Sequence, residues 1–322
     1  MIKLENVSKH YKNTKAVDDI SFEVKEGETL VLLGTSGCGK TTTLRMINRL
    51  TEPTAGNIIV NGKNIHDGQP EQLRRGIGYV LQHHGLFPHY TVAENIAIVP
   101  NLLKWDKRKT ENRTLELLEK LRLPKEFMHV FPSKLSGGQQ QRVGLARALA
   151  AYQPVLLMDE PLGALDPVTR AAIRKEFATL DELKKKTIVM VTHDVQEAFE
   201  LGDRVCLLDQ GRIVQIGKAV DLLFRPASSF VSSFLKEQRF QLELESILIK
   251  DVWTLLPKAI NGIEENEFSP GNSLWNVLET ISAAGQTGFQ RFVSINNNDK
   301  RQIDVASLLA AYTQYKNTLV NE

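Results

Sequence analysis

The chain has 322 residues, of which 42% are apolar and 24% charged, with a formal net charge of +2. These values are typical of a globular protein with a sizeable core, and the near-neutral charge gives no sign of a nucleic-acid or acidic partner. Two cysteines exclude a disulfide framework, the N-terminus lacks a signal-peptide pattern, and no apolar run approaches the roughly 20 residues of a membrane helix. We therefore expect a reducing setting, and any membrane connection would be made through a partner.

The first two thirds of the chain alternate between strand and helix patterns. Residues 1–33 predict β-structure that ends in a strand over 29–33. Next we expect a helix over 41–50, short strands around 58–60 and 78–81, and a mainly helical block over 88–150. Then come a strand at 155–159, a helix at 168–186, a strand at 187–193, a helix at 195–201 and two strands around Gln210-Gly211. This order predicts an α/β fold with a mostly parallel sheet and an inserted helical block.

The composition changes after about Phe234, so residues 236–322 are predicted to form a small C-terminal α+β appendage. Its expected elements are a helical run from Lys236 to Ile249, a helix over 273–284, a strand over 292–295, a polar turn at 296–299 and a closing helix over 305–315.

The stretch GTSGCGKTT, Gly34 to Thr42, lies between a predicted strand and a predicted helix and matches the pattern G-x-x-x-x-G-K-[ST]. Its glycines free backbone N–H groups to surround a phosphate, Lys40 can reach the outer phosphates of a nucleotide, and the Thr41 hydroxyl can bind Mg²⁺. A glycine-rich turn is the alternative, which the strand–loop–helix context disfavours. The predicted nucleotide-binding residues of this phosphate loop are Gly34, Thr35, Ser36, Gly37, Cys38, Gly39, Lys40, Thr41 and Thr42.

A second pattern, VLLMDEP from Val155 to Pro161, is an apolar strand that ends in two acids. It places Asp159 at the carboxyl edge of the sheet, where Mg²⁺ and a nucleotide would lie, and Glu160 where it could orient or deprotonate a water. Apolar strands that end in acids are common, so the pattern alone leaves a structural role open. Its combination with the phosphate loop favours the metal-binding and catalytic roles.

A third pattern, LSGGQQQR from Leu135 to Arg142, contains no reactive group. Ser136 can cap the helix that follows, and Gly137-Gly138 offer amide donors with no side chain in front of them, which predicts a second phosphate cradle. One helix separates this segment from the strand at Val155. That placement makes contact with a nucleotide on the same chain's phosphate loop awkward.

These three patterns, in this order, resemble the ATP-binding subunit of an ABC transporter. The resemblance covers residues 1 to about 235. It implies a P-loop NTPase fold of the ABC ATPase type, with a RecA-like parallel-sheet core, an N-terminal antiparallel β subdomain and an inserted helical subdomain at about 88–150. It also implies hydrolysis of ATP with Mg²⁺.

The resemblance assigns roles to further residues. Tyr11 matches the aromatic residue that stacks on adenine, and Gln82 matches the glutamine that contacts Mg²⁺ and the attacking water. Asp166 matches the loop that crosses the dimer interface, and His193 the histidine that contacts the γ-phosphate. By themselves, Tyr11 would be a strand-surface tyrosine and His193 a strand-end histidine. The implied sets are Glu160, His193 and Gln82 for catalysis, and Thr41, Gln82 and Asp159 for the metal.

In this family two chains form a head-to-tail dimer, and the LSGGQ segment of one closes over the ATP held by the other. The resemblance therefore implies that Ser136, Gly138 and Gln139 bind a nucleotide held by a second copy of the chain. The implied nucleotide-binding set also includes Tyr11, Gly137 and Asp166.

The stretch from Leu81 to Lys107 resembles ATP-binding subunits of bacterial quaternary-amine importers, the glycine betaine, choline and proline betaine class. This implies transmembrane permease subunits, an indirect periplasmic or lipid-anchored substrate-binding protein, and a peripheral place on the cytoplasmic face of the inner membrane. An importer of another small polar solute is the alternative. A soluble ABC ATPase outside transport is less favoured, because the chain has one ATPase unit and no long insertion.

The histidines after Gln82 and the C-terminal tail each allow two interpretations. His83, His84 and His89 lack accompanying cysteines or carboxylates, so a coupling loop that faces the permease is preferred to a metal site. Class members often carry paired CBS modules, whereas residues 236–322 have room for one divergent CBS-like unit. A dimerisation or packing appendage is an equal alternative for this tail.

Overall fold

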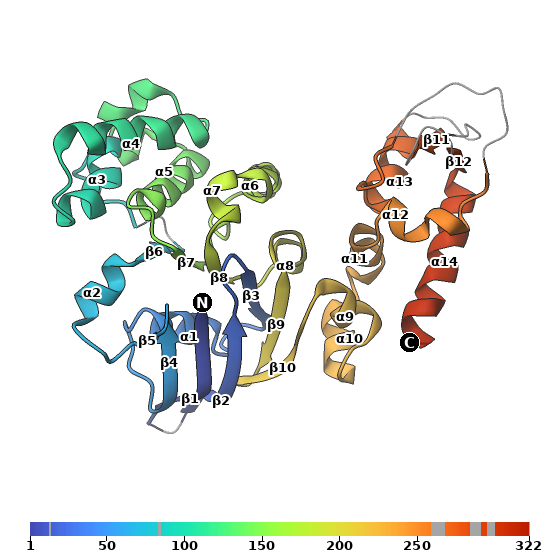
Figure 1. Ribbon diagram of the computed structural model, residues 1–322, viewed down its shortest axis with the longest axis horizontal. Coiled ribbons are helices and arrows are strands. Elements are labelled where there is room, and N and C mark those ends of the chain that lie inside the picture. Colours follow the sequence, from blue (N-terminus) through green and yellow to red (C-terminus); the bar gives the residue numbers. More distant parts are fainter. Residues whose placement is uncertain (13, 83–84, 259–267, 284–290, 295–299, 322) are drawn as a thin grey trace. The chain divides into compact units, whose positions relative to one another are not determined.

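The computed structural model describes residues 1–322 apart from 13, 83–84, 259–267, 284–290, 295–299 and 322 (Figure 1). The chain divides into two compact units, Met1–Ile216 and Gly217–Glu322. This boundary precedes residue 235, where the change in composition placed it. The difference arises because α9 (Ala219–Phe224) packs with α10 (Ser229–Leu235) and with α11 (Arg239–Ser246).

The first unit contains two β-sheets. The larger has the strand order β10-β9-β3-β8-β7-β6, and its pairings from β9 through β6 are parallel. Its strands are β3 (Thr29–Gly34), β6 (Ile77–Val80), β7 (Val155–Asp159), β8 (Thr187–Val191), β9 (Arg204–Asp209) and β10 (Arg212–Gly217). The smaller sheet is antiparallel with the order β2-β1-β4-β5. Its strands are β1 (Ile2–Tyr11), β2 (Thr14–Val24), β4 (Ala55–Val60) and β5 (Lys63–Asn64).

The core of this unit is continuous between the two sheets. The central strands β3, β7 and β8 are apolar runs buried along almost their whole length, as expected of a parallel sheet covered by helices. Helix α1 (Lys40–Ile47) contacts β7 and β8 of the larger sheet and β2 and β4 of the smaller one. Its Leu44, Met46 and Ile47 are fully buried, and each contributes about 1.5–3 kcal/mol to stability. This packing fixes the amino end of α1 beside the phosphate loop.

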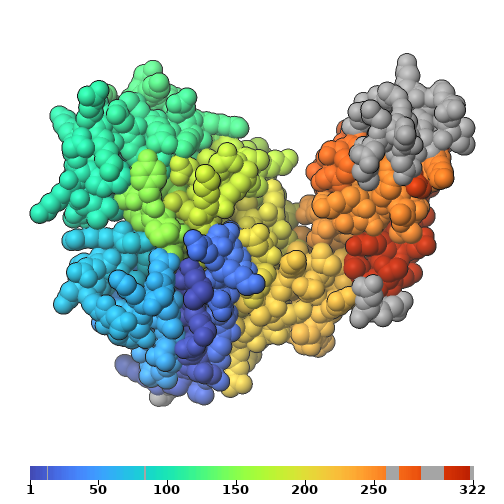
Figure 2. Space-filling view, in the orientation of Figure 1, coloured from blue at the N-terminus to red at the C-terminus, as the bar shows by residue number. Residues whose placement is uncertain are grey.

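The helical block folds as predicted into α3 (Val92–Leu102), α4 (Lys107–Lys120) and α5 (Gly137–Leu149), with 3-10 turns at Lys125–His129 and Pro132–Lys134. Helix α3 packs on both α4 and α5. The block forms one continuous region of the surface of the first unit (Figure 2). Its last helix, α5, starts directly after Ser136 and so carries the LSGGQ segment at its amino end.

Two helical segments differ from the sequence predictions. The stretch 168–186 divides into α6 (Pro167–Thr179) and α7 (Asp181–Lys184), because Leu180 adopts an extended backbone. The break lets Phe177 and Leu183 both turn into the interior. Helix α2 (Pro70–Arg75) is the second difference, because the sequence pattern predicts no helix there. Helix α8 (Val195–Leu201) is present as predicted.

The second unit adds α12 (Ile249–Val252), a 3-10 turn at Trp253–Leu255, α13 (Leu274–Ala283), the antiparallel pair β11 (Arg291–Ser294) and β12 (Lys300–Ile303), and α14 (Val305–Asn321). Lys316 of α14 joins this helix to α11, because its Nζ donates a 2.6 Å hydrogen bond to the buried carboxylate of Glu243. The same carboxylate also accepts a 2.7 Å hydrogen bond from Arg239 Nε, within α11. The predicted helix, strand and closing helix are present, and the polar turn at 296–299 lies outside the described residues. In the described part of the chain, no helix combines the length and apolar character that a membrane span requires.

Candidate active site

The phosphate loop connects β3 to α1 and wraps around the Lys40 ammonium. Lys40 Nζ is buried and donates hydrogen bonds to the carbonyl oxygens of Gly34 and Thr35, both at 2.8 Å. Gly39 has a φ of 103°, and a Cβ built there would lie 2.4 Å from the Ala16 oxygen of β2, so only glycine fits. Gly37 also has a positive φ, but a Cβ built there would meet no atom within 4 Å. The loop is thus closed on the β2 side and open at Gly37.

A hydroxyl and a carboxylate meet where β7 ends beside this loop. The Thr41 hydroxyl donates a 2.9 Å hydrogen bond to Asp159 Oδ1. Burial raises the pKa of Asp159, although the hydrogen bond from Thr41 opposes the shift. The two oxygens are hard ligands of the kind that Mg²⁺ prefers. Among the described residues, no group of three or more His, Cys, Asp or Glu side chains could hold a metal ion.

Three predicted catalytic side chains converge at the carboxyl ends of neighbouring strands. Glu160 follows β7, Gln82 lies just beyond β6, and His193 lies just beyond β8. Gln82 Nε2 donates to Glu160 Oε2 at 2.8 Å, and His193 Nδ1 lies 3.3 Å from the same oxygen. Glu160 has a left-handed backbone (φ 44°), and its N–H donates to the Val191 oxygen at 2.9 Å. The carboxylate is therefore aimed at a point that both neighbouring strand ends share.

The LSGGQ segment forms the first turn of α5. The Ser136 hydroxyl accepts a hydrogen bond from the Gln139 N–H at 3.3 Å, and Gln139 Oε1 accepts from the Ser136 N–H at 2.9 Å, which makes a reciprocal cap. A Cβ on Gly138 would lie 3.0 Å from Thr169 Cγ2, whereas one on Gly137 would meet only Leu165 Cδ2 at 3.7 Å. The segment therefore contacts the start of α6 in its own chain.

Two other predicted residues occupy simpler surroundings. Tyr11 ends β1, is 48% exposed, and has Lys9 Nζ 4.9 Å from its ring centroid. Asp166 precedes α6, and its Oδ1 accepts a hydrogen bond from the Thr169 N–H at 3.0 Å. Hydrogen bonding to Thr169 holds the pKa of Asp166 below its usual value. His83 and His84 lie outside the described residues, and His89 packs against the rings of Phe87 and Tyr90.

Two polar residues that were not predicted from the sequence lie beside Asp159. Tyr79 of β6 is half-buried, and burial raises its pKa, with the Asp159 charge acting in the same direction. Arg45 of α1 forms a side-chain hydrogen bond with Tyr79, and its charge favours the ionised form of Asp159. Arg45 is four residues after Thr41, so it lies on the same helix face, and that spacing was a signal that could have found it.

Comparison with known proteins decides the family. Residues 17–163 match the family model described as ABC transporter. The chain is 50% identical over 258 residues to the osmoprotectant import ATP-binding protein OsmV of Salmonella typhimurium, a match that covers 78% of this chain and 68% of that protein. The chain belongs to the ATP-binding proteins of ABC transporters.

Two further likenesses concern a second relative and the fold. This ABC ATP-binding chain is 51% identical over 240 residues to the glycine betaine/carnitine/choline transport ATP-binding protein OpuCA of Bacillus subtilis, covering 74% of this chain and 63% of that protein. The chain thus spans about two thirds of the length of both relatives. A solved dimeric structure of the ATP-binding cassette MJ0796, in a post-hydrolysis state bound to ADP and Pi, matches 68% of this chain and 98% of its own. Its TM-score of 0.61 and 37% identity confirm the predicted ABC ATPase fold.

Cys38 gives this ABC ATP-binding chain a chemical probe inside the phosphate loop. Its thiol is buried, Sγ lies 3.8 Å from Lys40 Nζ, and burial raises its pKa against the opposing Lys40 charge. Because the thiolate is the nucleophile, iodoacetamide should react slowly at neutral pH and faster as the pH rises past the ordinary value of 9.0. We expect ATP to protect Cys38, and alkylation to block ATP binding, as measured by mass spectrometry and nucleotide titration.

The second cysteine is the internal control for this experiment. Burial raises the pKa of Cys206 to about 12, so it should stay unmodified under the same conditions. Full ATP binding by protein with verified Cys38 modification would contradict the prediction.

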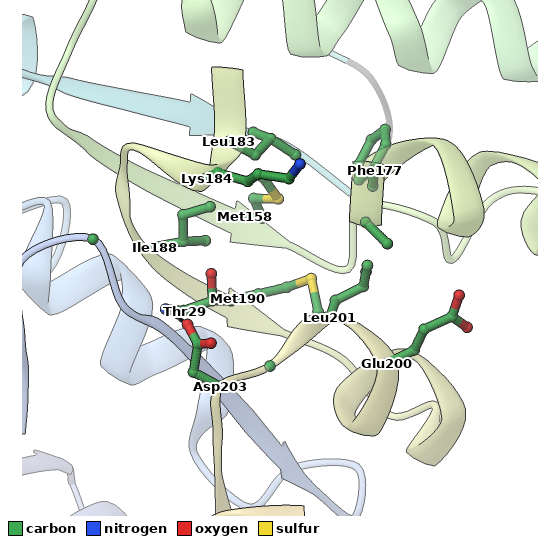
Figure 3. A pocket seen from close by; sticks show the side chains of 13 residues that line it. Thr29, Met158, Phe177, Leu183, Lys184, Ile188, Met190, Glu200, Leu201 and Asp203 are labelled. Carbon is green, nitrogen blue, oxygen red and sulfur yellow. Dashed lines mark hydrogen bonds between the residues drawn. The ribbon is translucent and has the colours of Figure 1, made fainter. Parts of the chain in front are cut away.

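A separate cavity of about 290 Å³ is lined in part by side chains of α6, α7 and α8, among them Phe177, Lys184 and Leu201 (Figure 3). Thr29 and Ile188 place it near the amino ends of β3 and β8, whereas the phosphate loop follows the carboxyl end of β3. Of the charged side chains around it, Lys184 is paired with Asp181 at 2.9 Å and Glu200 with Arg174. We regard this cavity as a packing feature that is distinct from the nucleotide site.

Proposed function

We propose that this chain hydrolyses ATP as a pair of copies and thereby powers import of a quaternary-amine osmoprotectant, such as glycine betaine, through a membrane permease. The observation that carries the ATPase part is the convergence of Gln82 and His193 on Glu160 Oε2, beside the Thr41–Asp159 pair. This arrangement provides a base and two orienting groups at the end of a phosphate loop, which phosphoryl transfer to water requires.

Each residue then has a defined task. Lys40 and the loop amides bind and neutralise the β- and γ-phosphates, and Glu160 orients and deprotonates the attacking water. Gln82 fixes the Glu160 carboxylate by its hydrogen bond, and His193 contacts the γ-phosphate. Thr41, Asp159 and Gln82 would hold Mg²⁺, which neutralises charge on the phosphates when it is bound with ATP.

The second copy supplies the other half of each site in this proposal. Ser136, Gly137, Gly138 and Gln139 would contact the ATP held by the partner chain, and Tyr11 would stack on the adenine held by its own chain. The dimeric form of the solved cassette bound to ADP and Pi supports this assembly. Loss of the γ-phosphate would remove the bridge between the two chains and reopen the dimer.

The transported solute is inferred from the relatives. Proteins about 50% identical to this chain are named for import of osmoprotectants and for transport of glycine betaine, carnitine and choline. We therefore place the chain on the cytoplasmic face of the inner membrane, with permease subunits and an external substrate-binding protein. An importer of another small polar solute is the runner-up, because the catalytic motifs do not depend on the solute.

The C-terminal unit is proposed to contain one divergent CBS-like unit. The order α13, β11, β12, α14 supports this proposal, and a packing appendage remains its alternative. Removal of residues after 235 with unchanged regulation of ATPase activity would favour the appendage.

Uptake measurements test the proposed function. The chain is reconstituted in vesicles with its permease and binding protein, and uptake of labelled glycine betaine is compared with that of choline, carnitine and proline. We expect ATP-dependent uptake of at least one quaternary amine, and Glu160→Gln should abolish it. ATP-dependent uptake of an unrelated solute without any quaternary-amine transport would establish the runner-up.

A further inference from the structure

The first two turns of α6 lie among three segments that the proposed reaction uses. A Cβ on Gly138 would lie 3.0 Å from Thr169 Cγ2 and 3.3 Å from Ile173 Cδ1, so the LSGGQ turn is seated on this helix. Asp166 caps the same helix through the Thr169 N–H. The third segment is the turn that carries His193, which α6 reaches through one arginine.

That arginine is Arg170, one turn into α6. Its Nη2 donates to the Leu165 oxygen at 3.1 Å, and its Nη1 lies 3.5 Å from Asp194 Oδ2. A guanidinium is planar and carries its donors in a fixed fork, so it holds two acceptors at a set separation. Arg170 thereby ties the residue before Asp166 to the residue after His193.

The His193 turn is anchored on both sides of the histidine. The Thr192 hydroxyl donates to the buried carboxylate of Glu197 at 2.6 Å and accepts from the Asp194 N–H at 3.0 Å. Asp194 Oδ1 accepts from the Glu197 N–H at 3.1 Å, which leaves Oδ2 to face Arg170. The His193 side chain itself is 56% exposed. Its direction toward Glu160 is therefore set by the turn more than by packing around the ring.

We propose that Arg170 is a positioning residue for ATP hydrolysis. Through its contacts with Leu165 and Asp194, it fixes the position of the Asp166 loop relative to the His193 turn. It acts on the chemistry only through these segments. The inference rests on the proposed ATPase function, and it adds a residue that the catalytic motifs do not include.

Arg174 provides a matched control one turn further along α6. Arg174 pairs with Glu200 of α8, and its Nη1 lies 3.4 Å from Gln196 Oε1. Like Arg170 with Asp194 at the start of α8, it links α6 to α8, but at positions further from His193. Arg174→Ala removes a comparable ion pair without touching the His193 turn. A general loosening of α6 against α8 would affect both arginine variants equally.

The test is steady-state ATPase kinetics of the full chain carrying Arg170→Ala, Arg170→Lys, Asp194→Asn, Arg174→Ala, or both Arg170→Ala and Asp194→Asn. We expect Arg170→Ala and Asp194→Asn each to lower kcat about tenfold with KM for ATP unchanged, since misplacement affects the chemical step. In Asp194→Asn, the asparagine keeps the Oδ1 atom that caps α8, so the fold is retained. The double variant should be no slower than either single variant, because both remove one contact. Arg170→Lys should recover part of the rate, and Arg174→Ala should match the unmodified chain.

Three results would overturn this inference while ATPase activity of the unmodified chain stands. They are an unchanged kcat in both Arg170→Ala and Asp194→Asn, an equal loss in Arg174→Ala, and losses that multiply in the double variant. If Arg170→Ala fails to fold, Asp194→Asn is compared with Arg174→Ala, and an unchanged kcat in Asp194→Asn or an equal loss in both variants would overturn the inference. An unmodified chain without ATPase activity would instead overturn the proposed function, and the two failures are thereby distinguished.

Discussion

Replacing Glu160 with glutamine should abolish ATP turnover while leaving ATP-dependent dimerisation intact. Glutamine keeps the size of the side chain, so Gln82 and His193 lose little of their packing. It cannot accept a proton from water, however, and it lacks the charge that orients the histidine. Loss of a positioned general base typically costs 10²–10⁴ in rate, and we expect kcat to fall by about 10³-fold.

Two measurements check this prediction. Phosphate release gives kcat, and size-exclusion chromatography with and without ATP gives the dimer fraction. Glu52→Gln is the control, because Glu52 is an exposed carboxylate that binds Arg49 and His66 away from the site. Turnover by Glu160→Gln at the rate of the unmodified chain would show that another group activates the water.

Placing an aspartate at Gly137 should stop hydrolysis without weakening ATP binding to a single chain. A Cβ at this position meets only Leu165 Cδ2, at an ordinary contact distance of 3.7 Å, so the fold tolerates it. In the proposed dimer the added carboxylate faces the phosphates held by the partner and repels them. Gly138 is a poorer choice, because a side chain there would press on Thr169 of α6.

The contrast between binding and turnover is the informative result for Gly137→Asp. Titration with ATP under monomeric conditions should give the Kd of the unmodified chain, whereas ATPase activity and ATP-dependent dimerisation should both be lost. Gly137→Ala, which adds a neutral methyl group, should retain part of the activity. Weakened ATP binding to the monomeric Gly137→Asp chain would mean that the LSGGQ segment serves its own chain's nucleotide.

The candidate site could be predicted where its chemistry is local in sequence. The phosphate loop is a continuous stretch of nine residues, and Asp159 and Glu160 are adjacent. Each lies at the carboxyl end of a strand that its apolar residues predict. Parallel strands bring their carboxyl ends to one edge, so the meeting of Gln82, Glu160 and His193 follows once β6, β7 and β8 are neighbours. The spacing of residues along the chain does not give that strand order, which the structure shows.

Other features depend on side chains that are distant in sequence. The contact between Arg170 and Asp194 joins different elements, and no local pattern marks it. The spacing from Thr41 could have pointed to Arg45, but nothing in the sequence near Arg45 indicates its partner Tyr79 on β6. The break at Leu180 likewise reflects tertiary packing, since Phe177 and Leu183 are both drawn into the interior. The start of the second unit at Gly217 depends on how α9 and α10 pack with one another, which composition does not report.

In the proposed dimer, each ATP site is completed by a second copy of the chain. The most direct test mixes two inactive variants, Lys40→Ala, which spoils the phosphate loop, and Gly137→Asp, which spoils the LSGGQ segment. If each site uses the loop of one chain and the LSGGQ segment of the other, a mixed dimer contains one site with both parts intact. ATPase activity should then appear on mixing, although neither variant has it alone. A mixture that forms mixed dimers yet stays inactive would contradict the shared-site account.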